Sequence, residues 1–225
     1  IKYKKMNGFK DLNFAISISV KDCTGCGNCA QVCPGMKGQK ALEMKDFSSE
    51  ISSQTAFDYL QSLKPKPEVL SKFKKSTVKG SQFRKPLLEF SGACAGCGET
   101  PYAKLLTQLF GSQMIISNAT GCSSIWSASF PSTAYTTVDG KGPAWHNSLF
   151  EDNAEFGFGI ATAQKYLRKP LIEKISEISN STSDDTLKDY CEKYILSSDD
   201  SCENQIDSEN LVNYLSSNKI KDIPS

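Results

Sequence analysis

The stretch that most constrains this chain is Cys23-Thr24-Gly25-Cys26-Gly27-Asn28-Cys29-Ala30-Gln31-Val32-Cys33-Pro34. Cysteines separated by two, two and three residues and followed by Pro are typical of loops that bind [4Fe–4S] clusters. Gly25 and Gly27 permit the left-handed backbone that a tight loop around a cluster requires. The spacing therefore predicts four metal ligands: Cys23, Cys26, Cys29 and Cys33.

The fourth cysteine of such a run binds the other cluster in proteins with two clusters. We therefore expect Cys23, Cys26 and Cys29 to hold one cluster and Cys33 to reach a second. No cysteine precedes Cys23, so we expect the chain to be a fragment of a longer polypeptide. A structural zinc site is the alternative, but zinc usually joins two distant C-x-x-C pairs, and the close spacing favours iron and sulfur.

Composition restricts the class of protein. The 225 residues are 39% hydrophobic and 23% charged, with a net charge of +1, as expected for one or two soluble globular domains. Neither nucleic acid nor an anionic membrane is indicated as a partner, and no apolar run is long enough to span a bilayer. Nine cysteines, several in C-x-x-C pairs and without a secretory signal, favour metal ligation in a reducing compartment.

The pattern before and after the first motif predicts a small α+β unit over residues 1–47, a partial ferredoxin-like domain. Apolar and polar residues alternate over 11–20, which predicts a strand with one buried face, and 41–44 resembles a short return strand. Residues 48–86 are interpreted as a linker. Apolar residues over 49–63 have helical spacing. The stretch 72–85 is basic and is interpreted as solvated; the alternative interpretation is a docking surface for an acidic electron-carrier protein.

A second cysteine motif, Cys94-Ala95-Gly96-Cys97-Gly98-Glu99-Thr100-Pro101, precedes an apolar stripe over 102–110. Thr100 is the expected N-cap of this helix, Pro101 suits its first turn, and Gly111 is expected to end it. Strands are predicted at 114–116 and 133–138, and a helix at 154–167. Alternating strands and helices predict an α/β domain over 87–168, with the polar loop 118–124 at the carboxyl end of a strand.

The remaining segment, 169–225, is acidic and rich in Ser and Asn. Helical pieces are expected near 171–178, 187–195 and 211–215, so the segment is interpreted as a helical insertion or a partly disordered tail. Cys191 and Cys202 lie in this weakly patterned region. We expect both to be free thiols rather than cluster ligands.

Three motifs together carry a resemblance to a known family. They are the second cysteine motif extended to Tyr102, the stretch Asn118-Ala119-Thr120-Gly121-Cys122-Ser123-Ser124, and the stretch from Gly142 to Gly157 that contains Trp145-His146-Asn147-Ser148. With the first cysteine run and Val78-Lys79-Gly80-Ser81-Gln82, residues 10–168 closely resemble the pyruvate:ferredoxin (flavodoxin) oxidoreductases.

The resemblance implies oxidative decarboxylation of pyruvate with CoA to acetyl-CoA and CO2, with thiamine diphosphate, Mg2+ and [4Fe–4S] clusters as cofactors. It implies that Cys94, Cys97 and Cys122 ligate a cluster beside the thiamine, and that Glu99 and Cys122 contact thiamine diphosphate. The run from Cys23 to Cys33 matches one arm of the family's two-cluster domain. Ferredoxin or flavodoxin is the implied electron acceptor.

Departures from the family pattern limit these expectations. A further cluster cysteine and the G-D-G motif for diphosphate and Mg2+ are not found in this sequence, so we expect the fragment alone to be inactive. The complete protein is expected to be a homodimer in the cytoplasm or in a hydrogenosome-like organelle, under anaerobic conditions. The alternatives are an electron carrier fused to a zinc-binding module and a pyruvate:NADP oxidoreductase.

Overall fold

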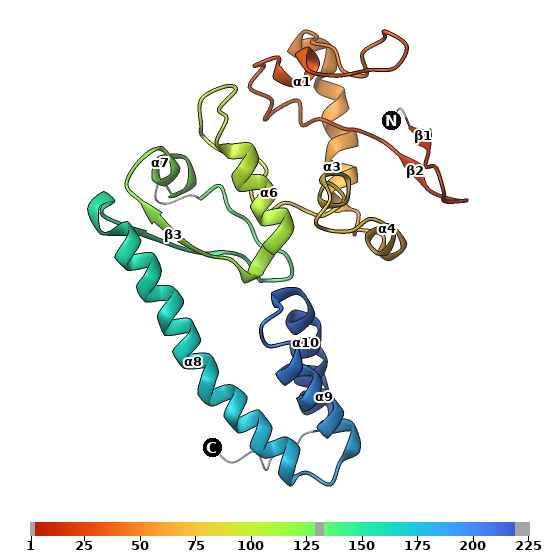
Figure 1. The fold of residues 1–225 in the computed structure, drawn as a ribbon. Helices are drawn as coiled ribbons and strands as arrows, with labels where there is room; N and C mark the ends of the chain where they lie inside the picture. The colour runs from red at the N-terminus through yellow and green to blue at the C-terminus, as the bar shows by residue number, and fades with distance from the viewer. Residues whose placement is uncertain (1–2, 129–132, 219–225) are drawn as a thin grey trace. The chain divides into compact units, whose positions relative to one another are not determined.

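The computed structural model describes residues 3–128 and 133–218. It divides into two compact units, Ile1–Asn153 and Ala154–Ser225, which we call unit 1 and unit 2 (Figure 1). Unit 1 mixes short helices with two sheets of two strands each, whereas unit 2 is helical. The mixed α and β character predicted from the sequence is therefore confirmed. The boundaries predicted at residues 47, 86 and 168 stay predictions.

The strand predicted over 11–20 is wrong in its extent and in its burial. Only Asn13–Phe14 (β2) form a strand, paired antiparallel with Lys4–Lys5 (β1). Ile16 is 56% exposed, so the alternating apolar residues do not cover a core. The buried residue of this segment is Ser19, whose hydroxyl group hydrogen-bonds to neighbouring side chains.

Two further predicted strands are also absent from the described residues. The segment 41–44 is extended without a strand partner. In 133–138, residues Tyr135 and Val138 form only isolated bridges, with Leu88 and Lys141 respectively. A turn follows, in which Asp139 and Gly140 both have positive φ angles. Hairpin pairing depends on a partner strand, which the local alternation of residue types does not reveal.

The helix predicted over 49–63 is confirmed as a succession of short helical segments. These are α2 (Phe47–Glu50), η1 (Ile51–Ser53) and α3 (Gln54–Ser62), followed by α4 (Pro67–Lys72) and α5 (Val78–Ser81). Phe73 stacks on Phe83 with ring centroids 5.2 Å apart. Lys79 lies over the Phe73 ring at 4.4 Å, so part of the basic stretch is used for packing inside unit 1.

Helix α6 (Thr100–Phe110) follows the second cysteine motif and ends at Gly111, as predicted. Its N-cap is Glu99, one residue earlier than the predicted Thr100. The helix is fixed by Thr107, which is 1% exposed and whose Oγ1 accepts a hydrogen bond from the Leu87 amide at 3.0 Å. With Leu87 and Leu88, both nearly inaccessible, this contact belongs to a buried part of unit 1.

The second sheet of unit 1 consists of two parallel strands, β3 (Ile115–Ala119) and β4 (Ala144–Ser148), with Ser117 opposite His146. The strand predicted at 114–116 is confirmed but is longer, and Ile115 is 41% exposed. Strand β4 was not predicted, because its polar residues show no regular alternation. A short helix, α7 (Cys122–Ala128), follows β3.

Unit 2 is formed by α8 (Asn153–Ser181), α9 (Asp185–Leu196) and α10 (Ser201–Ser217). Helix α8 (teal in Figure 1) continues through Pro170. The predicted helices are confirmed and longer than expected. They share one apolar cluster, formed by Ile175, Leu187, Cys191, Tyr194 and Leu211. Within the described ranges, no helix has the length and apolar character needed to cross a membrane.

Candidate functional site

The first cysteine loop lies at the surface of unit 1. Cys23, Cys26 and Cys29 are exposed and Cys33 is partly exposed, all with free thiols. Gly25 and Gly27 have φ angles of +70° and +78°, the left-handed conformation expected from the motif. Gly27 also caps the short helix α1 (Asn28–Gln31). The loop thus presents its thiols on a strongly curved backbone, which suits the ligation of a compact cluster.

Polar contacts hold the beginning of this loop. Ser19 Oγ donates to Asp22 Oδ2 at 2.5 Å, and the Lys21 amide donates to Gln54 Oε1 at 3.1 Å. The Cys23 amide donates to the Ser19 carbonyl group at 3.0 Å. Gln54 is 8% exposed and lies at the start of α3. Helix α3 therefore positions the chain where it enters the first cysteine loop.

The segment that follows the loop supports Cys33. The Ala41 amide donates to Cys33 Sγ at 3.3 Å, and amide hydrogen bonds, first from Ala41 and then from Leu42, lower the pKa of the Cys33 thiol. A lowered pKa favours the thiolate, which is the form that binds metal. The residues predicted as a return strand therefore act here through their backbone amides.

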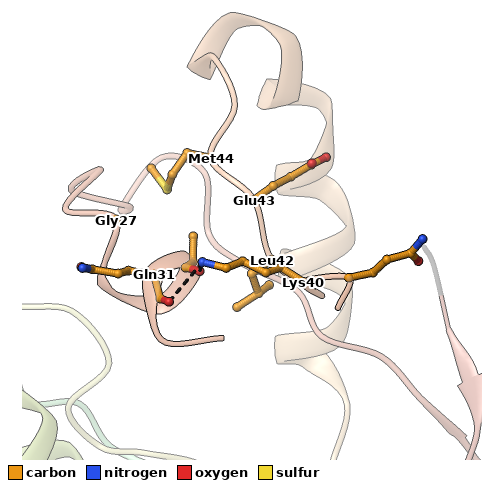
Figure 2. Close-up of a pocket in the computed structure, with 8 residues that line it drawn as sticks. Gly27, Gln31, Lys40, Leu42, Glu43 and Met44 are labelled. Carbon is orange, nitrogen blue, oxygen red and sulfur yellow. Dashed lines mark hydrogen bonds between the residues drawn. The ribbon is translucent and has the colours of Figure 1, made fainter. Parts of the chain in front are cut away.

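Lys40 connects this segment to α1. Its Nζ donates to the carbonyl groups of Ala30 at 2.7 Å and Gln31 at 3.1 Å. The two segments border an open hollow of about 750 Å³, which Lys40 crosses toward Gln31 (Figure 2). The ammonium group thus binds the last carbonyl groups of α1, where a positive charge is favourable.

The second cysteine loop lies against the first. The Cys97 amide donates to the Cys94 carbonyl group at 3.0 Å, closing a turn in which Gly96 has φ +75°. A Cβ atom placed on Gly96 would lie 3.2 Å from Asn28 Nδ2 and 3.6 Å from the Cβ atom of Cys26. The structure therefore places the Gly96 turn of the second loop beside Asn28 and Cys26 of the first.

Glu99 and Cys122, the residues expected at thiamine diphosphate, lie at the starts of α6 and α7. Trp126 is 8% exposed, and its Nε1 donates to Glu99 Oε2 at 3.2 Å. Burial, with a smaller effect of the Glu99 charge, raises the pKa of Tyr135. Glu99 therefore does more than complement the N-terminus of a helix, because a buried indole fixes its carboxylate.

Polar side chains gather where β3 and β4 end. Asn118 Nδ2 donates to Asn147 Oδ1, and Asn147 Nδ2 donates to Thr120 Oγ1, both at 3.2 Å. Ser148 Oγ donates to Asn153 Oδ1 at 3.3 Å. The carboxyl ends of parallel strands are the usual place for ligands in α/β sheets. The sequence motifs contain Asn118 and Asn147 but do not indicate that their side chains form a network.

The described side chains do not by themselves form a metal-binding site. Among the described residues, no group of three or more His, Cys, Asp or Glu side chains is arranged so that it could hold a metal ion. The donor set nevertheless suits iron and sulfur, because accessible thiols stand on curved, glycine-containing loops. Cys191, by contrast, is 1% exposed in unit 2, and burial raises the pKa of its thiol. Cys191 forms no disulfide, and that it is no cluster ligand stays a prediction; the Cys202 side chain lies outside the described part.

Comparison with known proteins agrees with the position of the first loop. Residues 16–35 match the model of the 4Fe-4S binding domain. The chain is 50% identical over 198 residues to the pyruvate-flavodoxin oxidoreductase of Klebsiella pneumoniae, a match that covers 88% of this chain and 16% of the relative. It is 52% identical over 191 residues to the pyruvate:ferredoxin oxidoreductase of Moorella thermoacetica, with 84% and 16% covered.

A third relative has another name. The pyruvate dehydrogenase [NADP(+)] of Cryptosporidium parvum is 46% identical over 215 residues, which is 95% of this chain and 10% of the relative. The match over residues 16–35 thus defines a protein segment with a 4Fe–4S binding domain. The chain belongs to the pyruvate:ferredoxin (flavodoxin) oxidoreductase family, and it spans about one sixth of the length of the first relatives.

Proposed function

We propose that this chain is the part of a pyruvate:ferredoxin (flavodoxin) oxidoreductase in which electrons leave the thiamine diphosphate site and enter iron–sulfur clusters. In this reaction pyruvate and CoA give acetyl-CoA, CO2 and a proton, and a pair of electrons passes singly to ferredoxin or flavodoxin. The observation that carries the proposal is the contact between two cysteine loops in a sequence about half identical to these enzymes.

Each cysteine group has its own place in this proposal. Cys94, Cys97 and Cys122 hold the cluster nearer to thiamine diphosphate, and Cys23, Cys26 and Cys29 hold the next one. Cys33 reaches a further cluster. Amide donors lower the pKa of the Cys33 thiol, which supports its service as a thiolate ligand. The clusters supply one-electron redox chemistry, and these side chains bind and orient them.

Thiamine diphosphate supplies the decarboxylation chemistry when bound. Glu99, held by the Trp126 indole at 3.2 Å, contacts the cofactor in this proposal, as does Cys122. The Asn118–Asn147 pair at the ends of β3 and β4 orients the adjoining loop. The ligands of Mg2+ are assigned to residues outside this sequence, as expected from the motifs.

NADP is a second candidate for the electron acceptor. The Cryptosporidium relative, named for NADP, matches 95% of this chain. The segment described here is therefore compatible with both acceptors, and we propose ferredoxin or flavodoxin first because more of the similar relatives carry those names.

The test is anaerobic purification of the native protein, followed by iron and sulfide analysis and by reduction of a viologen dye with pyruvate and CoA. Cys26→Ala should lower iron content and dye reduction, whereas Cys191→Ala, a matched loss of one thiol in unit 2, should lower neither. Protein without sulfide, with zinc, or inactive with pyruvate and CoA would contradict the proposal. Repeating the assay with ferredoxin, flavodoxin and NADP identifies the acceptor.

A further inference from the structure

The two cysteine loops lie beside each other at Gly96. Gly96 lies between Cys94 and Cys97, directly before Cys97, and Asn28 lies between Cys26 and Cys29, directly before Cys29. The position of a Cβ atom on Gly96 is 3.2 Å from the Asn28 carboxamide nitrogen and 3.6 Å from Cys26 Cβ. Each loop therefore meets the other at the residue between two of its predicted ligands.

Two properties of Gly96 make this contact sensitive to substitution. Its φ of +75° is unfavourable for any residue with a Cβ atom. The contact to Asn28 would also be tighter than ordinary van der Waals contact, so the carboxamide group would have to move. Nearby glycines differ, because a Cβ atom on Gly92 or Gly98 would meet nothing within 4 Å.

We infer that Gly96 and Asn28 are positioning residues that set the separation of the two cysteine loops and bring Cys26 closest to the Cys94–Cys97 turn. The inference rests on the proposed function and adds the residues that determine how close the two cluster-binding loops lie. With clusters bound as proposed, the Cys94–Cys97 turn and Cys26 would each hold a one-electron redox group, and the Gly96 backbone would lie between the two.

The experiment uses the native protein, purified anaerobically and fully reduced with dithionite, in variants Gly96→Ala and Gly92→Ala. Electron paramagnetic resonance measures the magnetic coupling between reduced clusters, and freeze-quenched samples taken after mixing with pyruvate and CoA measure the transfer between them. Gly96→Ala should weaken the coupling and slow this transfer about tenfold, as is typical when a supporting residue of a metal site is lost. Gly92→Ala should match the wild type in both measurements.

A double variant tests the contact itself. Asn28→Ala alone should weaken the coupling, but by less than Gly96→Ala, because it introduces no backbone strain. Asn28→Ala combined with Gly96→Ala should restore part of the coupling that Gly96→Ala loses, because the crowded carboxamide is gone. If Gly96→Ala does not retain its clusters, Asn28→Leu applies the same crowding from the other loop without backbone strain. It should weaken the coupling in the same direction.

The outcomes separate this inference from the function on which it rests. Wild-type protein without clusters would overturn the proposed function, and the inference with it. Wild-type protein with clusters, but with Gly96→Ala and Asn28→Leu both equal to the wild type, would overturn the positioning role alone. The positioning role would also be overturned if the double variant lost as much magnetic coupling as the sum of the losses in Asn28→Ala and Gly96→Ala.

Discussion

The two units are held together in different ways. Unit 2 has a continuous apolar cluster, in which Leu187 and Leu211 are 4% and 5% exposed. Around the cysteine loops of unit 1, large apolar side chains such as Ile16 and Val32 are 56% and 75% exposed, and polar contacts such as those of Ser19 and Gln54 fix the backbone. The difference indicates that unit 2 is stabilised by burial of apolar side chains, whereas the cysteine loops of unit 1 would gain their stability from the clusters that we propose they bind.

The largest effect should come from removal of iron and sulfide. Because ligation supplies folding free energy where little apolar surface is buried, chelation should raise amide exchange in 19–33 and 91–98 by about 100-fold or more. Exchange in α9 should not change. Hydrogen exchange with mass spectrometry measures both regions in one sample. Equal loss of protection in α9 would contradict the comparison, as would loops that stay protected without iron.

The reverse test removes apolar surface from unit 2. Leu187→Ala should lower the free energy of unfolding of unit 2 by about 2–5 kcal/mol, because the residue is buried in the apolar cluster. Iron content and the spectrum of the clusters should stay as in the wild type. Exposed Leu196 provides the matched control, since Leu196→Ala at 85% exposure should change stability by no more than about 0.5 kcal/mol. A loss of clusters in Leu187→Ala would show that the units are not independent.

A smaller effect is expected from the polar support of the first loop. Gln54→Leu removes the acceptor of the Lys21 amide, at a cost of about 1–3 kcal/mol for a partly buried group left unpaired. Exchange at 19–26 should rise, and clusters should be lost faster in air. Ser62→Ala on the exposed side of the same helix is the control. If both variants lose clusters at the same rate, α3 does not position the loop.

The sequence predicted the chemistry of these regions better than their shape. Cysteine spacing and glycine positions depend on local geometry, so the left-handed Gly25 and Gly27 were foreseeable, as were the helices with a 3.6-residue period. The strand predicted through Ile16 failed because alternation indicates a face that could be buried, and nothing covers it. Strand β4 was missed for the opposite reason, since its pairing with β3 does not depend on alternating apolar residues.

The contacts between distant segments could not be predicted at all. Nothing near Gly96 in the sequence indicates Asn28, and nothing near Glu99 indicates that the Trp126 indole donates to it. Both contacts join segments at least 27 residues apart, and such pairs are determined by how the elements pack. The residues expected to bind cofactors were found from motifs, whereas the residues that position them required the structure.

The smallest expected effect concerns the pH dependence of unit 2. Asp184 caps α9, accepting from the amides of Thr186 at 2.9 Å and Leu187 at 3.2 Å, and it accepts from Tyr214 Oη at 2.5 Å. The Tyr214 hydrogen bond, with the amides, lowers the pKa of Asp184, and the Asp184 carboxylate raises the pKa of Tyr214.

The two shifts act at opposite ends of the pH scale. A lowered pKa in the folded state means that Asp184 stabilises unit 2 above its ordinary pKa of 3.8, and that this contribution is lost as the pH falls through the folded value. The raised pKa of Tyr214 gives a contribution that is present below its ordinary value of 10.0 and is lost as the pH rises through the folded value.

Asp184→Asn keeps a good N-cap residue but removes the titrating carboxylate. It should flatten the acid limb of unit 2 stability, measured by exchange in α9 from neutral pH to below pH 3.8. Tyr214→Phe should flatten the alkaline limb while leaving the cap in place. Because apolar burial rather than charge holds unit 2, both variants should stay folded at neutral pH. Unfolding of unit 2 in either variant at neutral pH would show that this polar contact, and not the apolar cluster, maintains the helices.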